Sequence, residues 1–275
     1  IRDKLVTGVQ TCALPISFTG YLLLAGGSLD VTAGGGSDNS TSDTSQKGLK
    51  CDGDVTVSLA GEDEYLSVSA ADDAVNAKGS VTVTAGEVTL SSSDDGITAD
   101  RSLTLSGGSV TVTKAYEGLE GETVVLSGCR VSVTASDDGI NAGTAITVSD
   151  GSVYVNAGGD GLDSNGSIYV TGGTTVIEGP TGDNNGALDK GDGADAVLSI
   201  TGGTVLALGS AGMAINFDSG TQCAALAAVS GSAGDEIAVD DGSGFSFTAS
   251  KAFACAVYSS PSLTQGSSYT LTVGS

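Results

Sequence analysis

The sequence predicts an all-β fold: a right-handed parallel β-helix with about 22 residues and three strands per coil, ending in a small β-rich cap. Three observations lead to this prediction. A short acidic motif recurs at a nearly constant interval, apolar and polar residues alternate between the motifs, and long apolar helical segments are absent. A unit of this size cannot bury its apolar face alone, so neighbouring units must stack.

Residues 1–16 are set aside before the fold is predicted. They resemble the in-frame translation of a short-read sequencing adapter, with Lys4 and Leu5 where an index would be read. The alternative is a targeting segment, but Gln10 and Pro15 interrupt its apolar run. We therefore expect the natural N-terminus to be missing from this sequence.

The repeated motif is an acidic residue, a small residue and a branched apolar residue. Five copies align, and their second positions are 22, 22, 21 and 22 residues apart. These copies are Asp73-Ala74-Val75, Asp95-Gly96-Ile97, Glu117-Gly118-Leu119, Asp138-Gly139-Ile140 and Asp160-Gly161-Leu162. Looser copies occur at Lys47-Gly48-Leu49, Ala187-Leu188-Asp189 and Gly212-Met213.

Each unit contains three short strands in which every second side chain points inward. In the common register these inward residues form three columns that would line one continuous core. The columns are Val81, Leu103, Val124, Ile146 and Ile168; Val88, Val110, Val131, Val153 and Thr175; and Val75, Ile97, Leu119, Ile140 and Leu162. Neither a six-residue period nor the glycine-rich nonapeptide of calcium β-rolls is present.

The chain is predicted to divide into a β-helix over residues 17–215 and a β-rich capping module over residues 216–275. Alternation persists after residue 216, but the acidic turn does not recur in register. A bare solenoid end would expose strand edges, which a cap prevents. Cys223 and Cys255 lie in this module and could form a disulfide or remain buried thiols.

Composition limits the possible functions. The net charge of −23 becomes −24 without residues 1–16, which carry a net +1, and this charge argues against nucleic acid and anionic membranes as partners. The absence of histidine argues against serine-hydrolase triads and zinc hydrolases. No apolar run is long enough to span a membrane. We expect a monomer that is secreted or held at the cell surface.

The acidic turns are the first candidate site. Carboxylates stacked ~4.8 Å apart repel by about 1 kcal/mol in water and about 3.5 kcal/mol at an effective dielectric constant of 20. Calcium, which binds six to eight oxygen ligands, would relieve this repulsion. Single Asp-Gly pairs are also ordinary solvated turns, and only the column favours an ion. The candidate ligands are Asp94, Asp95, Glu117, Glu120, Asp137, Asp138, Asn141, Asp160 and Asp163.

Outward-facing tyrosines are the second candidate site. Sugar rings stack on aromatic faces, and Tyr116, Tyr154 and Tyr169 occur among hydroxyl-rich strand positions. They are the predicted carbohydrate-binding residues. The alternative is that tyrosine and threonine simply favour exposed strand positions.

Two further classes of function stay open. A β-helix polysaccharide lyase or glycosidase would use Arg101, Lys114 or Arg130 as a base, or a pair of carboxylates such as Asp137 and Asp138. A structural cell-surface stalk or adhesin would use none of these residues.

Several segments together resemble a family of secreted bacterial carbohydrate-binding proteins with a polysaccharide-lyase-like β-helix. The segments are Tyr116-Glu117-Gly118-Leu119-Glu120-Gly121, Ser136-Asp137-Asp138-Gly139-Ile140-Asn141-Ala142, residues 159–167 and 185–189, Ser259-Ser260-Pro261-Ser262-Leu263 and Gly266-Ser267-Ser268-Tyr269-Thr270. The resemblance implies calcium binding and affinity for cellulose and acidic pectic polymers, without established catalysis. Asp137, Asp138, Asp160 and Asp163 match the family's acidic turns. The family's N-terminal coils are expected to be missing.

Overall fold

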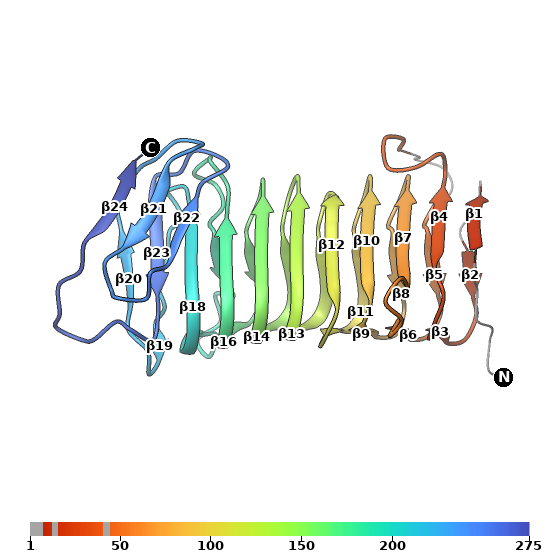
Figure 1. Cartoon of the computed structure of the whole chain (residues 1–275), viewed down its shortest axis with the longest axis horizontal. Coiled ribbons are helices and arrows are strands. Elements are labelled where there is room, and N and C mark those ends of the chain that lie inside the picture. The colour runs from red at the N-terminus through yellow and green to blue at the C-terminus, as the bar shows by residue number, and fades with distance from the viewer. Residues whose placement is uncertain (1–7, 13–15, 41–44, 275) are drawn as a thin grey trace.

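A computed structural model describes residues 8–12, 16–40 and 45–274 of the chain. The described residues contain strands and no helix, and they form a parallel β-helix of about eight coils, each of roughly 22 residues (Figure 1). The predicted fold class is confirmed. Consequently the described part of the chain has no helix long and apolar enough to cross a membrane.

Each coil contributes one strand to each of three faces. The first face contains β3 (Leu22–Leu24), β6 (Val55–Ser58), β9 (Val81–Ala85) and the end of β11 (Ile97–Leu105). The second contains β4 (Leu29–Ala33), β7 (Tyr65–Ala70), β10 (Glu87–Ser92) and β12 (Ser109–Lys114). The third contains β2 (Ile16–Phe18), β5 (Leu49–Cys51), β8 (Val75–Ala77), the start of β11, β15 (Leu162–Ser164) and β17 (Leu188–Lys190).

Later strands bend from one face to the next without a break. β13 (Leu119–Ala135) and β14 (Ile140–Ala157) pass through all three faces, whereas β16 (Ser167–Glu178) and β18 (Leu198–Gly209) pass through the first and second. The acidic motif always falls at the turn from the second face to the third.

The register agrees with the repeat in the sequence. Leu103 pairs with Val81 on one side and with Val124 on the other, and Ile97 likewise lies between Val75 and Leu119. Every residue of the three predicted columns is buried. The predicted core is therefore confirmed, and it runs along the axis of the helix as one cluster.

The C-terminal residues form the predicted β-rich cap. After β19 (Ser219–Gly220), the strand β23 (Cys255–Ser259) pairs antiparallel with β18, and β20 (Ala224–Ala227) pairs with β23. These strands cover the sheet edge that the last coil would otherwise expose.

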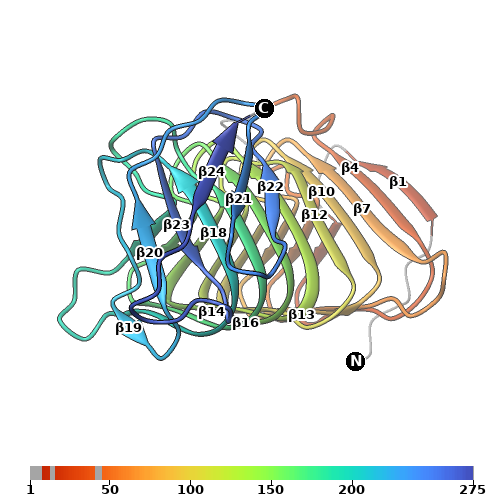
Figure 2. The same cartoon turned by 60° about the vertical axis from the view of Figure 1, so that its left-hand side comes forward.

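The cap also folds back over the outer surface of the second face. Its second sheet contains β21 (Glu236–Val239), β22 (Ser246–Thr248) and β24 (Leu271–Gly274), which lie in front of the final coils in Figure 2. Leu206 and Leu208 of β18 point outward and are buried in a cluster with Ile237, Phe253 and Tyr258. Strand β18 in the last coil therefore buries apolar side chains on both of its surfaces, inward in the core of the β-helix and outward against the cap.

Cys51, Cys129, Cys223 and Cys255 are free. In the antiparallel pair, Ala224 lies opposite Ser259 and Ala227 lies opposite Ala256. Cys223 and Cys255 therefore lie toward opposite ends of this pair, which is why the disulfide does not form. Both are free thiols, but only Cys255 is buried as the alternative expected, whereas Cys223 is half-buried.

The N-terminal segment continues the stack. The strand β1 (Gly8–Cys12) pairs in parallel with β4. Residues 1–7 and 13–15 lie outside the described part of the chain. The adapter origin of residues 1–16 stays a prediction.

Candidate cation-binding corner and aromatic surface

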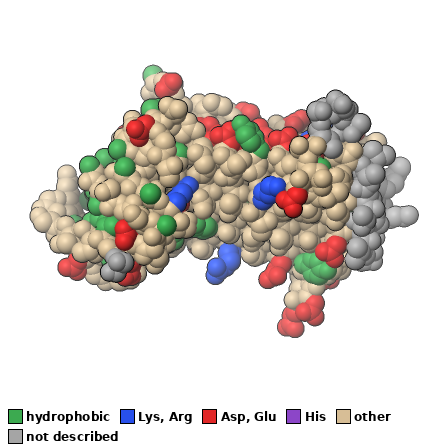
Figure 3. Space-filling view, turned by 90° about the horizontal axis from the view of Figure 1, so that it is seen from above, with side chains coloured by type: hydrophobic (Ala, Val, Ile, Leu, Met, Phe, Trp, Pro, Cys, Tyr) green, Lys and Arg blue, Asp and Glu red, His purple; other side chains and the backbone are tan. Residues whose placement is uncertain are grey.

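The acidic residues gather along one edge of the β-helix, which we call the acidic corner. It comprises the turns between the second and third faces and the outward residues of the strands that follow. Seen from above, red acidic side chains form a band along this edge (Figure 3). Its carboxylates are those of Asp72, Asp73, Asp94, Asp95, Glu117, Glu120, Asp137, Asp138, Asp160, Asp163 and Asp189.

Backbone hydrogen bonds fix the spacing of these turns. The Gly96 amide donates to the Glu117 carbonyl at 2.9 Å, and the Gly118 amide donates to the Asp138 carbonyl at 2.9 Å. A Cβ atom at Gly118 would lie 2.2 Å from Cγ1 of Val133 and 2.3 Å from the Gly139 carbonyl oxygen. The glycine of the motif is therefore required by close packing.

The inner acids also have a structural role. Oδ1 of Asp138 accepts the Asp160 amide at 2.7 Å, and Oδ1 of Asp160 accepts the Gly186 amide at 2.5 Å. Asp95 accepts the Glu117 amide at 3.3 Å and the Thr98 hydroxyl at 3.1 Å. Each acid thus binds a backbone amide of the next coil, a role that an asparagine oxygen would also fill.

An outer polar column lies beside the inner one. Glu120 pairs in register with Thr98 and Asn141, and Asp163 pairs with Asn141 and Asp189. Nδ2 of Asn141 donates to Oε2 of Glu117 at 3.1 Å, which links the two columns. The predicted ligands in the central coils therefore lie along one continuous edge.

The central acids are poorly compensated. Burial raises the pKa of Asp95 to about 7, and repulsion by neighbouring acids, Asp73 and Asp94 foremost, adds to the rise. Burial also raises the pKa of Asp163 to about 7 and that of Asp160 to about 6, and the charge of Asp138 adds to both. The pKa values of Glu117, Glu120 and Asp138 are raised with burial as the first cause.

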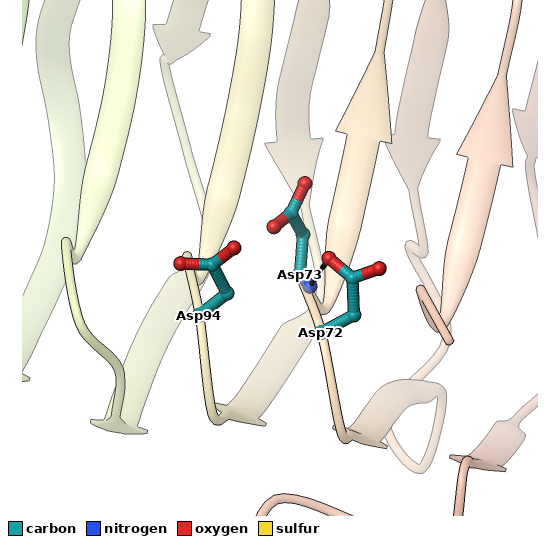
Figure 4. Close-up of side chains that lie close together, drawn as sticks. All are labelled: Asp72, Asp73 and Asp94. Carbon is teal, nitrogen blue, oxygen red and sulfur yellow. Dashed lines mark hydrogen bonds between the residues drawn. The ribbon is translucent and has the colours of Figure 1, made fainter. Parts of the chain in front are cut away.

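The corner is compensated at its N-terminal end. Nζ of Lys47 lies 3.0 Å from Oδ1 of Asp72 and also forms an ion pair with Asp73. Carboxylate oxygens of Asp72, Asp73 and Asp94 all lie within 4.8 Å of one another (Figure 4). Within the described residues this triad is the closest-spaced acidic group, and it already has a cationic partner.

The remaining corner lacks such a partner. Among the described residues, no ion pair reaches Asp95, Asp138, Asp160 or Asp163. Their oxygens do not converge as closely as those of the triad. A hard cation with many oxygen ligands and tolerant geometry, such as calcium, fits this donor set better than a cation that needs a rigid cage.

The three predicted tyrosines lie in different places. Tyr116 belongs to the acidic corner and is exposed, and its hydrogen bond with Asp137 raises the pKa of its hydroxyl. Tyr169 is exposed on the first face, beside Thr147 and Ser199. They therefore do not form one shared stacking surface.

Tyr154 is partly covered by the cap. Its ring centroid lies 6.1 Å from that of Phe247, and its hydroxyl donates to Oε2 of Glu178 at 2.6 Å. Burial raises the pKa of Tyr154 to about 12. The expectation of an outward-facing ring was correct, but the cap lies against this ring and leaves it only partly accessible.

The candidate lyase bases do not converge either. Lys114 donates to the Ser37 carbonyl at 2.6 Å and pairs with Asp38 at 3.0 Å. Arg130 is exposed at the start of a second-face strand, whereas Arg101 lies at the turn from the third face to the first.

Two functional features were missed by sequence reasoning. Lys47 belongs to a looser copy of the motif, and because Leu49 pairs with Val75 it takes the position of the acid Asp73. That alignment could have revealed the ion pair. Asp189 also belongs to a looser copy, at the far end of the corner.

Fold and site together define an acidic parallel β-helix with an uncompensated row of carboxylates. The family model described as "Carbohydrate-binding domain-containing protein" matches residues 8–96 and 96–270. The chain belongs to this family, which supports polysaccharide binding. No curated protein and no solved structure matches the chain.

Proposed function

We propose that this protein is a non-catalytic polysaccharide-binding protein whose acidic corner binds calcium, and that it acts outside the bacterial cell on plant cell-wall polysaccharides. The observation that carries the proposal is the row of half-buried acids without a cationic partner. Buried carboxylates are stable as anions only when they are paired or coordinate a metal.

Two groups of residues are the proposed ligands. Asp95, Glu117 and Glu120 form one, and Asp138, Asp160, Asp163 and Asp189 form the other. Calcium supplies positive charge that carboxylates from two molecules can share. The carbonyl oxygen of Asn141 lies between the groups in register and adds a neutral ligand.

The charge of the chain explains why a cation is needed. A protein with net charge −23 repels an acidic pectic polymer, so direct binding through this edge is unfavourable. Calcium at the acidic corner reverses the sign of the local potential. The exposed ring of Tyr116 lies on the same edge, where a sugar held by its carboxylate can stack on it.

The test is retention of the full chain on insoluble pectate and cellulose, with calcium and with chelator. The proposal expects retention on pectate that disappears with chelator. The double variant Asp160→Asn, Asp163→Asn keeps the amide-accepting oxygens but removes two charges, so it should retain its fold and lose most pectate retention. Asp150→Asn is the matched control, because Asp150 is exposed at a different turn.

The outcomes separate the competing functions. New ultraviolet absorbance or reducing ends from polygalacturonate would identify a lyase or hydrolase and contradict the non-catalytic proposal. Absence of retention on both glycans, with and without calcium, would contradict glycan binding and favour a structural stalk or adhesin.

A further inference from the structure

A cavity of about 650 Å³ lies in the C-terminal cap, away from the acidic corner. It is bounded by residues 220–225 and 227, by Tyr258 of β23 and by the loop that leads from β23 to β24, which passes outside β20 in Figure 1. Its size falls within the roughly 300–1,000 Å³ of small-molecule sites.

The walls of this cavity, which we call the cap pocket, carry no charged side chain among the described residues that line it. Amide and hydroxyl groups come from Thr221, Gln222, Thr264, Gln265 and Ser267. Apolar surface comes from tyrosine, leucine, valine and alanine side chains. A lining without charged side chains is unusual in a chain of net charge −23.

Hydrogen bonds hold the polar walls in place. Nε2 of Gln222 donates to the Gly203 carbonyl and to Oγ of Ser259, both at 2.8 Å. Both N–H groups of this amide are thereby used, and Oε1 is its remaining hydrogen-bonding atom. The charge of Asp241 is engaged by the hydroxyl groups of Tyr258, at 2.8 Å, and Ser260.

Tyr269 supplies a fixed aromatic ring. Its hydroxyl accepts the Thr264 amide at 2.9 Å and donates to the Ser262 carbonyl at 3.3 Å. Its hydroxyl thus both donates and accepts a hydrogen bond within the loop, while 37% of the surface of the residue stays exposed. The ring therefore presents apolar surface at the pocket with little freedom to rotate.

We infer that the cap pocket binds an uncharged sugar, as the end or a short segment of a neutral glycan, independently of calcium. Sugar hydroxyls match the amides and hydroxyls of the walls, and the carbon face of a sugar ring matches Tyr269. A uronic acid would bury its carboxylate without a cationic partner here, which is costly. This inference rests on the proposed function in that it takes the ligand to be a glycan.

The test is calorimetric titration of the full chain in chelator with uncharged pentasaccharides of glucose, xylose and galactose. At least one should bind, and pentagalacturonate should not. Tyr269→Ala should weaken binding about tenfold or more, because it removes the stacking surface. Ala225→Trp should block the pocket, since Ala225 is exposed at its wall and the substitution removes no contact of the fold. Tyr21→Ala, which removes an exposed tyrosine near the other end of the β-helix, is the matched control and should bind normally.

Two results would overturn the inference. One is that no uncharged pentasaccharide binds, while pectate retention with calcium persists. The other is that binding is unchanged in both pocket variants when their melting curves show that they are folded. Conversely, a neutral sugar could bind in chelator while pectate is not retained under any condition. This result would support a sugar site in the cap pocket and contradict the function proposed for the acidic corner.

Discussion

A lysine offsets the repulsion between carboxylates at the N-terminal end of the acidic corner, whereas no described lysine or arginine does so in its central coils. At the N-terminal end, Lys47 forms ion pairs with Asp72 and Asp73, and its hydrogen bond holds the pKa of Asp72 below its ordinary value although burial would raise it. Burial still raises the pKa of Asp73, and Lys47 opposes this rise. No described lysine or arginine pairs with Asp95, one coil beyond Asp73, or with Asp163, four coils beyond it, and both pKa values rise to about 7.

The difference teaches how a stacked repeat handles like charges. Repeating the same turn brings the same charge into register at every coil, and the repulsion grows with the number of coils. One internal cation compensates the coil next to it but not distant ones, because partial exposure and salt screen the interaction. The central coils therefore depend on proton uptake or on an external cation.

The largest expected effect is on the pH dependence of stability. The central acids have folded pKa values above their unfolded values, so the folded state binds more protons between about pH 4 and pH 7. In chelator, the free energy of unfolding should fall as the pH rises through this range. Calcium should flatten the decline, because it replaces the lost protons.

Urea titrations at half-unit pH steps, with and without calcium, measure this effect. Asp241, with its pKa lowered to about 2 by hydrogen bonds to serine and tyrosine despite some burial, acts in the opposite direction but only below about pH 4. A calcium-free stability that is flat or rises between pH 4 and pH 7 would contradict the assignment of uncompensated acids.

Removal of the internal cation should have the next largest effect. Lys47→Met leaves Asp72 and Asp73 without their partner, and breaking such a pair should cost about 3 kcal/mol in chelator. Calcium should restore part of this loss, since the triad with Asp94 then becomes an unoccupied acidic group. The measurement is the free energy of unfolding in urea.

Lys78→Met is the control, because Lys78 forms an exposed pair with Asp52 at 2.9 Å. Its loss of stability should be much smaller and insensitive to calcium. Equal losses of stability in the two variants would mean that the ion pairs of Lys47 in the acidic corner contribute no more than an exposed ion pair does.

A smaller effect is expected from removing one charge in the central corner. Asp163→Asn should stabilise the chain by about 1 kcal/mol in chelator, because it relieves repulsion that solvent only partly screens. The same variant should bind calcium about tenfold more weakly, as measured by calorimetry. Asp150→Asn should change neither property; if it matches Asp163→Asn, the effect reflects net charge alone.

Most of the fold was predictable because the information is local and repeated. Val88, Val110 and Val131 follow one another at the coil interval, and parallel stacking then fixes their register and burial. The cap itself was predicted, but its path over the second face was not. Contacts such as that of Phe247 with Tyr154 join segments nearly a hundred residues apart that share no repeat.

The candidate site was predictable only in part. The position of the acids along one edge follows from the interval between the motifs. The hydrogen bonds of these acids to the amides of the next coil do not follow from the interval, since they depend on the conformation of each turn. The cap pocket was not predictable either, because residues 220–227 meet the loop that carries Tyr269 only through the antiparallel pairing of β20, β23 and β18.

The antiparallel pairing of β23 on β18 also affects how copies of this protein meet. A parallel β-helix with open ends can lengthen by adding further copies end to end, as fibres do. Here the C-terminal end presents β20, a four-residue strand that is held on β23 and runs in the same direction as β18. A second copy would find a strand shorter than β4, β7, β10 and β12 of its own second face, which have five or six residues, and stacking into long filaments is disfavoured at this end.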